Sequence, residues 1–334
     1  MSILLAIPAI CFLGFLAIIL ALRKKWLAAL VFLAAAVILN SATQQIPVRF
    51  GRSGDGIDTT GTRVRIFEYN TCAEDRFQHK HDSTFIDYII SQDADILFLP
   101  ENLYYVDREL DTALSKVYPY GVFHQIPSGK QPEELTLYSR FPLKDVKRLP
   151  SPTVAEGSDG MVMATAEIGG RDVTLVHLHF TSSHYGIKRG YDLREKELET
   201  IRPALDTVST PMIICGDLND LSGSPTLKGL QEYGLRNAWW THGCGPGFTF
   251  KKGILRFRLD HLLYSPDIQV EKIKVDRKAD FSDHYPIIAD LIVSTMYRTS
   301  SSVTYGPLGR HIPTLNMASE TDGSSWPKRF AGRR

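Results

Sequence analysis

The chain opens with two apolar runs. Residues 2–22 contain no charged side chain, and residues 26–39 are apolar again after the basic triplet Arg23-Lys24-Lys25. About 20 apolar residues suffice to cross a bilayer as a helix. The pattern therefore predicts an N-terminal transmembrane helical hairpin over residues 1–42, with the second span on the short side. Neither run has a polar face, which disfavours a pair of buried core helices.

The basic triplet predicts the orientation of this hairpin. By the positive-inside rule Arg23-Lys24-Lys25 stays in the cytoplasm, so everything after Ala42 lies on the other side. A cleaved signal peptide is the alternative, with the triplet as its n-region and Asn40-Ser41-Ala42 as a poor cleavage site. The position of the triplet far inside the chain counts against it. We expect a multi-pass protein of the cell membrane, anchored by two N-terminal helices, with an extracytoplasmic soluble domain.

Downstream, a polar, glycine-rich linker over residues 43–62 is followed by apolar runs that alternate with helical patterns. Strands are predicted at 64–69, 96–100, 135–138, 161–168, 173–180, 212–215, 259–264, 268–275 and 287–293, and helices at 83–91, 106–116, 192–208 and 225–233. Gly169-Gly170 indicates a hairpin, while other strands are joined through helices. The mixture predicts a layered α/β (α+β) domain over residues 63–295. Residues 296–334, rich in Ser, Gly and Pro, are predicted to be a disordered tail.

Composition narrows the classes of function. The chain of 334 residues has 43% hydrophobic residues and a formal net charge of +1. Near-neutral charge argues against a protein whose main task is to grip nucleic-acid backbones, although nuclease chemistry needs only local positive charge. The four cysteines are scattered without zinc-site spacing. A bridge between Cys72 and Cys244 stays open at this stage.

Polar side chains recur where predicted strands end or begin. Singly, each could cap a helix or close a turn. Six such positions in one domain indicate a site. They are Asn70, Glu101, His177-Leu178-His179, Gly216-Asp217-Leu218-Asn219, Asp260 and Ser282-Asp283-His284-Tyr285-Pro286.

In this order, together with Ser139-Arg140-Phe141-Pro142, these residues resemble the endonuclease/exonuclease/phosphatase superfamily, whose founding fold is that of pancreatic deoxyribonuclease. The resemblance covers roughly residues 63–293. GDLN alone would be a weak signal, but GDLN followed by SDHYP, with Glu101 and His179 before them, is strong. The resemblance implies a four-layer sandwich of two face-to-face mixed β-sheets flanked by helices, with the site at one end.

The resemblance also implies a bound metal. Carboxylate and amide oxygens suit Mg²⁺, with Mn²⁺ as the alternative. Glu101 is the first choice as ligand, and Asn70 lies beside it as a further ligand and a substrate-binding residue. Asp283 is a candidate for a second or shifted metal position. Pro100 stands before Glu101 where the family often has glutamine.

The catalytic roles are implied in the same way. His284 would accept a proton from the attacking water and Asp260 would orient its imidazole. Asp217 and Asn219 would orient the nucleophile and bind phosphate, with Asp217 open as acid or base. His179 would contact the scissile phosphate or assist the leaving group. His177 points to the same face and remains an alternative. The role of Asp220 is open, and Glu133 and Glu134 are too loose a match to assign.

The sequence thus predicts a membrane-anchored, Mg²⁺-dependent phosphoesterase that hydrolyses a phosphodiester or phosphomonoester, with a lipid head group or lipid-linked phosphate as the preferred substrate. An extracytoplasmic nuclease acting on DNA or RNA and an inactive binding module are the alternatives, and no obligate protein partner is expected. Lys251, Lys252, Arg256 and Arg258 form a basic strip that could meet an anionic substrate, and Trp239-Trp240 could contact an interface or pack.

Overall fold

The computed structural model describes residues 6–47, 60–72, 83–102, 108–122, 135–153, 159–183 and 186–294. Residues 48–59 of the predicted linker and the whole predicted tail, 296–334, lie outside these ranges. The division into hairpin, linker, domain and tail stays a prediction.

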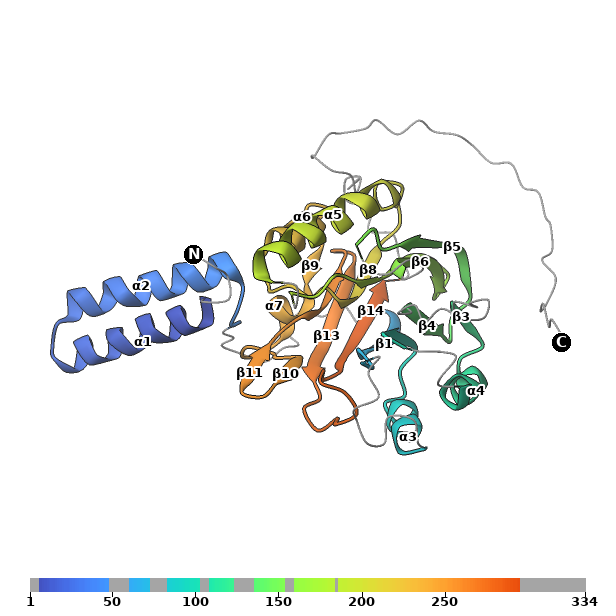
Figure 1. The fold of residues 1–334 in the computed structure, drawn as a ribbon, viewed down its shortest axis with the longest axis horizontal. Coiled ribbons are helices and arrows are strands. Elements are labelled where there is room, and N and C mark those ends of the chain that lie inside the picture. Colours follow the sequence, from blue (N-terminus) through green and yellow to red (C-terminus); the bar gives the residue numbers. More distant parts are fainter. Residues whose placement is uncertain are drawn as a thin grey trace.

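Two six-stranded mixed sheets form the domain (Figure 1). The first consists of β1 (Gly61–Glu68), β2 (Ile96–Pro100), β3 (Tyr120–Val122), β4 (Leu135–Ser139), β13 (Ile268–Val275) and β14 (Ile287–Ser294), in the order β13-β14-β1-β2-β4-β3. The second consists of β5 (Leu143–Pro150), β6 (Asp159–Ile168), β7 (Arg171–His179), β8 (Met212–Asp217), β9 (Arg236–Asn237) and β12 (Asp260–Tyr264), in the order β5-β6-β7-β8-β12-β9. Each sheet has one central parallel pair, β1 with β2 and β7 with β8.

The sheets pack face to face and helices cover their outer faces. Val64 and Ile66 of β1 meet residues such as Leu175 and Ile213 of the second sheet in the shared core. Because both faces of each sheet are buried, many strands are continuous apolar runs in the sequence. The covering helices are α3 (Ser83–Ser91) and α4 (Arg108–Val117) on the first sheet and α5 (Ile187–Leu205) and α6 (Pro225–Gln231) on the second. The predicted α/β fold with two mixed sheets is confirmed.

A small two-stranded hairpin and a short helix complete the domain. The hairpin pairs β10 (Phe250–Lys252) with β11 (Leu255–Phe257) around Gly253 and Ile254. The helix, α7 (Ala238–His242), buries Trp239, whose indole N–H donates to the carbonyl of Gly245 at 2.9 Å. Trp239 therefore packs rather than contacting an interface.

Two apolar helices, α1 (Ala6–Leu22) and α2 (Trp26–Thr43), lie side by side and project from the domain (Figure 1). By length and composition α2 can cross a membrane, while α1, with 17 described residues, is shorter. Their large apolar side chains are not buried: Phe12, Phe15, Leu22, Trp26 and Leu27 are 61–80% exposed. Contiguous exposed apolar surface of this kind marks a membrane or protein contact.

The end of α2 is fastened to the domain. The helix stops at Gln44, whose backbone is left-handed (φ 50°), and the buried amide of Gln45 donates to the Ser222 carbonyl at 2.7 Å. Arg258 donates to the carbonyls of Gln44 (2.8 Å), Gln45 (3.2 Å) and Pro246 (2.6 Å) and to the Ser222 hydroxyl (2.6 Å). Burial lowers the pKa of Arg258 to about 9. The prediction that Arg258 belongs to an exposed basic strip is therefore wrong, because its guanidinium holds the junction between α2 and the domain.

A buried histidine beside this junction makes stability depend on pH. His261 donates from Nε2 to the Asp220 carbonyl (2.9 Å), while Nδ1 faces the Asn237 amide nitrogen (3.3 Å). Burial, aided by the charge of Arg258, lowers its pKa to about 4. The unfolded chain therefore binds more protons than the native chain between about pH 6.5 and 4, and the native state is stabilised at higher pH.

We expect the free energy of unfolding to fall by up to about 3 kcal/mol from this group as the pH drops through that window. His261→Gln should remove this part of the decline. Urea unfolding at a series of pH values measures both effects. Equal slopes for the variant and the wild type would contradict the expectation.

Candidate active site

Register alone brings the predicted residues to one end of the two sheets. In the second sheet His179, at the end of β7, lies opposite Asp217 on the parallel strand β8, and Asp217 lies opposite Asp260 on the antiparallel strand β12. In the first sheet Asn70 follows β1 and Glu101 follows β2, which are parallel neighbours. The carboxyl ends of parallel strands meet at the same edge of a sheet, so four of these side chains converge there.

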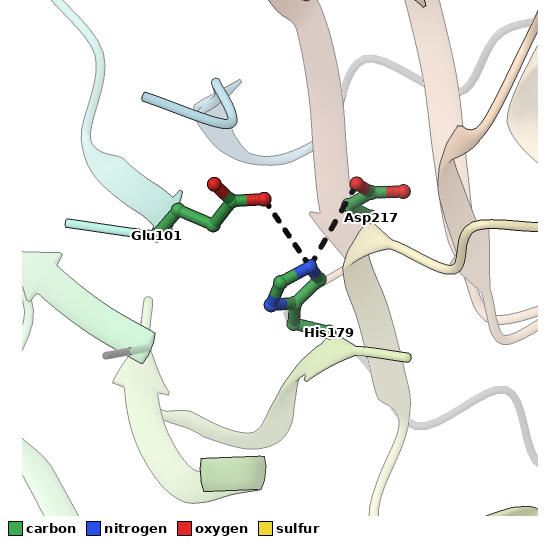
Figure 2. Close-up of side chains that lie close together, drawn as sticks. All are labelled: Glu101, His179 and Asp217. Carbon is green, nitrogen blue, oxygen red and sulfur yellow. Dashed lines mark ion pairs between the residues drawn. The ribbon is translucent and has the colours of Figure 1, made fainter. Parts of the chain in front are cut away.

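Glu101, His179 and Asp217 form the first part of this cluster (Figure 2). Nε2 of His179 lies 3.5 Å from Oε1 of Glu101 and 3.9 Å from Oδ2 of Asp217. Glu101 has a left-handed backbone (φ 56°) directly after the strand. A glutamate in this region is strained by about 1–3 kcal/mol, and such strain gathers at functional sites.

Two amides hold Asp217. Asn70 donates from Nδ2 to Oδ2 of Asp217 at 3.0 Å and to Oε1 of Glu101 at 2.9 Å, so it joins the two carboxylates. Asn219 donates its backbone N–H to Oδ1 of Asp217 (2.8 Å) and its side-chain amide to Oδ2 (3.1 Å). Oδ1 of Asn70 accepts the backbone N–H of Cys72 at 2.8 Å, which fixes this orientation.

Gly216 explains the first letter of the GDLN motif. Its φ is 145°, and a Cβ placed there would lie 2.0 Å from the carbonyl oxygen of Leu178. Only glycine lets β8 approach β7 this closely, because any side chain would push against the backbone of its neighbour. The motif thereby sets His179 and Asp217 in register.

Asp260 and His284 form the second part of the cluster. Nδ1 of His284 lies 2.8 Å from Oδ2 of Asp260, and its Nε2 lies 3.7 Å from Oδ2 of Asp217. Burial alone would lower the pKa of His284, but the carboxylates of Asp260 and Asp217 outweigh it and raise the pKa to about 10. Burial disfavours the charged form of Asp260 and would raise its pKa. The charge of His284 and the hydrogen bonds that Asp260 accepts from His284 and Thr249 outweigh burial, so the pKa of Asp260 is lowered. Asp260 thus stays ionised and orients the imidazole.

The cluster fits a divalent cation. Glu101, His179 and Asp217 each offer one ligand atom within 4.8 Å of the others, and so do Asp217, Asp260 and His284. Burial, and then the charge of Asp260, raise the pKa of Asp217 to about 6 against the opposing pull of His284, His179 and the Asn219 N–H. Nearby positive charge relieves such repulsion between carboxylates, and oxygen ligands suit Mg²⁺ or Mn²⁺.

The structure separates the two histidines of β7. His177 is fully buried, lies edge-to-face against Phe98 at 5.3 Å, and has no partner for either ring nitrogen among the described residues. Burial lowers its pKa well below the ordinary value. His179 is the one that faces Glu101 and Asp217, which favours the assignment to His179.

Other candidates lie elsewhere. Asp283 is next to His284, and its charge helps to raise the pKa of His284, but it is in neither three-residue group found among the described residues.

Asp220 is buried and lies 3.3 Å from Nε of Arg194 on α5, so the two residues form a structural ion pair. Cys72 is buried and Cys244 is exposed, and no disulfide joins them, so the bridge is not formed. Glu133 and Glu134 lie outside the described residues.

Sequence reasoning missed Glu68. This glutamate ends β1, is fully buried, and has no N–H or O–H donor for either carboxyl oxygen among the described residues. Burial, and then the charges of Asp260 and Asp217, raise its pKa well above the ordinary value. In its protonated form Glu68 can donate a hydrogen bond to the neighbouring carboxylate of Asp260, which holds His284.

Replacing Glu68 tests this support. Glu68→Gln keeps a donor of the same shape, and we expect kcat within about threefold of wild type. Glu68→Leu leaves a buried Asp260 oxygen unpaired, and we expect kcat to fall by about tenfold or more with little change in KM. Steady-state kinetics measures both. Equal kcat values in the two variants would show that a hydrogen-bond donor at position 68 does not support Asp260.

Comparisons with known proteins agree with this geometry. The Endonuclease/Exonuclease/phosphatase family matches residues 72–284, whereas no curated protein matches the chain. Three solved structures are similar in fold. An endonuclease/exonuclease/phosphatase from Beutenbergia cavernae is 20% identical (TM-score 0.55; 70% of this chain and 72% of that one). ANGEL2, a 2′,3′-cyclic phosphatase with adenosine-2′,3′-vanadate, is 15% identical (TM-score 0.57; 70% and 97%). D. rerio TDP2 with a single-strand DNA product is 16% identical (TM-score 0.56; 69% and 98%).

The matched residues, from Cys72 to His284, include ten of the twelve strands of the two large sheets and most of the cluster. The chain belongs to the Endonuclease/Exonuclease/phosphatase family.

Proposed function

We propose that the chain is a membrane-anchored, divalent-metal-dependent phosphoesterase that hydrolyses a phosphate ester of a lipid or lipid-linked substrate by in-line attack of water. The observation that carries this proposal is the buried Asp260–His284 hydrogen bond of 2.8 Å, with the free ring nitrogen of His284 directed at the cluster around Asp217. A pair of this kind activates a nucleophile or protonates a leaving group.

Family membership and the buried cluster of acids and histidines make the chain a phosphoesterase. Within the proposal, His284 accepts the proton of the attacking water and Asp260 orients its ring. Asp217 and Asn219 position the water and the phosphate, and His179 meets the scissile phosphate or the leaving oxygen.

Glu101 is the proposed principal metal ligand, with Asn70 and Asp283 as further candidates. A bound Mg²⁺ would neutralise the phosphoryl oxygens and, by its charge, bring the pKa of His284 down towards neutrality.

The proposed lipid preference rests on the two apolar helices. Their exposed side chains need an apolar surrounding, and α2 can cross a membrane. We infer a two-helix anchor with the basic triplet Arg23-Lys24-Lys25 in the cytoplasm, which puts the catalytic domain on the outer side.

A nuclease is the second candidate, favoured by the similarity to TDP2 bound to single-strand DNA and to ANGEL2 bound to a nucleoside vanadate. An inactive binding module is disfavoured because Glu101, Asp260 and His284 are all in place.

A substrate panel with Glu101→Gln tests the proposal. Sphingomyelin, undecaprenyl pyrophosphate, inositol phosphates, DNA and RNA are offered with Mg²⁺, Mn²⁺ or chelator. We expect turnover of a lipid substrate, lost with chelator, and a fall in kcat/KM of about 10²-fold or more for Glu101→Gln because a metal ligand is weakened. Glu199→Gln, on the exposed face of α5, is the control. DNA cleaved as readily as lipid would favour the nuclease, and full activity of Glu101→Gln would refute the metal assignment.

A further inference from the structure

The turn of the β10–β11 hairpin carries two adjacent exposed aliphatic side chains. Ile254 is 96% exposed, the highest value among the large apolar side chains in the described part of the domain, and its neighbour Leu255 is 51% exposed. An isolated exposed leucine needs no explanation, but two adjacent aliphatic side chains at the tip of a projecting hairpin do.

Two positively charged side chains, those of Lys252 and Arg256, flank this tip in the sequence. Lys252 and Arg256 are exposed neighbours of Ile254, and no carboxylate pairs with either of them among the residues that the structure describes. Within the described ranges, the Arg256 guanidinium bonds to two carbonyls of its own hairpin, those of Gly253 (2.6 Å) and Leu255 (2.7 Å). Aliphatic residues flanked by unpaired cations are typical of segments that lie in the interface of an anionic bilayer.

The hairpin lies on the side of the domain that carries the apolar helices. Figure 1 shows β10 and β11 at the edge facing α1 and α2. The contacts agree, because Arg258, the first residue after β11, bonds to the carbonyls of Gln44 and Gln45 at the end of α2. The base of the hairpin and the end of the apolar helix are therefore fastened at one point.

The same hairpin is joined to the active site. The ring of Phe250 lies 5.0 Å from that of His284, and the backbone N–H of Lys251 donates to the Asp283 carbonyl at 2.8 Å. Just before β10, the hydroxyl of Thr249 accepts the backbone N–H of Asp260 at 3.1 Å. Any surface that the hairpin contacts therefore lies close to the active site.

We propose that the β10–β11 hairpin is a second membrane contact. Ile254 and Leu255 enter the headgroup–acyl boundary of the bilayer that α1 and α2 occupy, while Lys252 and Arg256 meet anionic headgroups. This inference rests on the proposed function, because it takes the helices as the anchor. It deepens that function by setting the site at headgroup level, so the substrate class is a phosphate ester of a lipid still embedded in the bilayer.

Quenching by brominated lipid tests the contact without any activity assay. The full chain is reconstituted in vesicles of phosphatidylcholine and phosphatidylglycerol, as Ile254→Trp and as the matched control Val146→Trp. Val146 is 48% exposed and belongs to β5, which Figure 1 shows at the opposite side of the domain from β10 and β11. We expect brominated acyl chains to quench the added indole at position 254 but not at position 146. Equal quenching at the two positions overturns the proposal. An unquenched indole at 254 in a chain that self-associates in detergent assigns the patch to a second copy and also overturns it.

Kinetics then separates this inference from the proposed function. For Ile254→Ser/Leu255→Ser, the activity on a vesicle-embedded ester relative to a water-soluble aryl phosphate ester should fall at least about tenfold, because interfacial binding scales with buried apolar area. Val146→Ser should keep the wild-type ratio. An unchanged ratio in the hairpin variant refutes the hairpin as a membrane contact. A wild-type chain that cleaves neither ester refutes the proposed function instead, and the quenching result still decides the membrane contact.

Discussion

His284→Gln is expected to lower kcat by about 10³-fold while leaving the fold intact, since general acid–base groups contribute about 10²–10⁴-fold. Glutamine can keep a hydrogen bond to Asp260 but cannot take up or release a proton at the reacting oxygen. KM should change little, because the loss falls on the transition state. Steady-state kinetics, with circular dichroism to confirm folding, measures the effect.

Asp260→Asn supplies the partner experiment. The amide removes the charge that raises the pKa of His284 and opposes its tautomer, so kcat should again fall by about 10²-fold or more. If the two residues act as one unit, the double variant should be scarcely worse than His284→Gln alone. Additive losses would show that Asp260 and His284 act in separate steps, and wild-type turnover in either variant would refute the assignment.

The strands that sequence predicted best carry a clear apolar pattern, either continuous, as in the fully buried β2, or periodic, as in the edge strand β13. β2 and β13 have the predicted bounds, and β6, β7 and β14 differ at their ends by a few residues. The missed strand β5 reads LKDVKRLP and is largely exposed along its length, so no apolar pattern marks it. β10 and β11 are too short and too polar to stand out. Pairing with a neighbouring strand, which sequence does not display, makes these segments strands.

The site residues, like the strands, were predicted only where the sequence pattern makes them visible. Asn70, Glu101, His179, Asp217 and Asp260 lie at strand ends, a position visible in the sequence. Glu68 was missed because a glutamate is usually exposed to solvent. The alternation of β1 places it on the same face as the core residues Val64 and Ile66, and the packing of the second sheet buries it there. Arg258 was misread for the converse reason, since its basic neighbours suggested a solvated strip. Long-range contacts to Glu68 and Arg258 decide both cases.

Arg258→Met is expected to lower the free energy of unfolding of the domain by about 3 kcal/mol. Arg258 is 3% exposed, and its guanidinium donates to four oxygens, those of Gln44, Gln45, Pro246 and Ser222. Methionine fills much of the volume but leaves these acceptors buried without donors. Because the acceptors stay, the substitution is costly even though the buried charge was itself unfavourable. Chemical unfolding of the full chain in detergent measures the loss.

Arg256→Met is the matched control, two residues away and exposed, and should change stability by less than about 0.5 kcal/mol. The contacts of Arg258 also predict a loss of activity. Arg258 precedes Leu259, whose carbonyl accepts the N–H of Leu218 between Asp217 and Asn219, so a loosened Arg258 should lower kcat as well as stability. If Arg258→Met unfolds like Arg256→Met, the end of α2 is not fastened through this guanidinium. The junction would then depend on other contacts, such as the bond from the Gln45 amide to the Ser222 carbonyl.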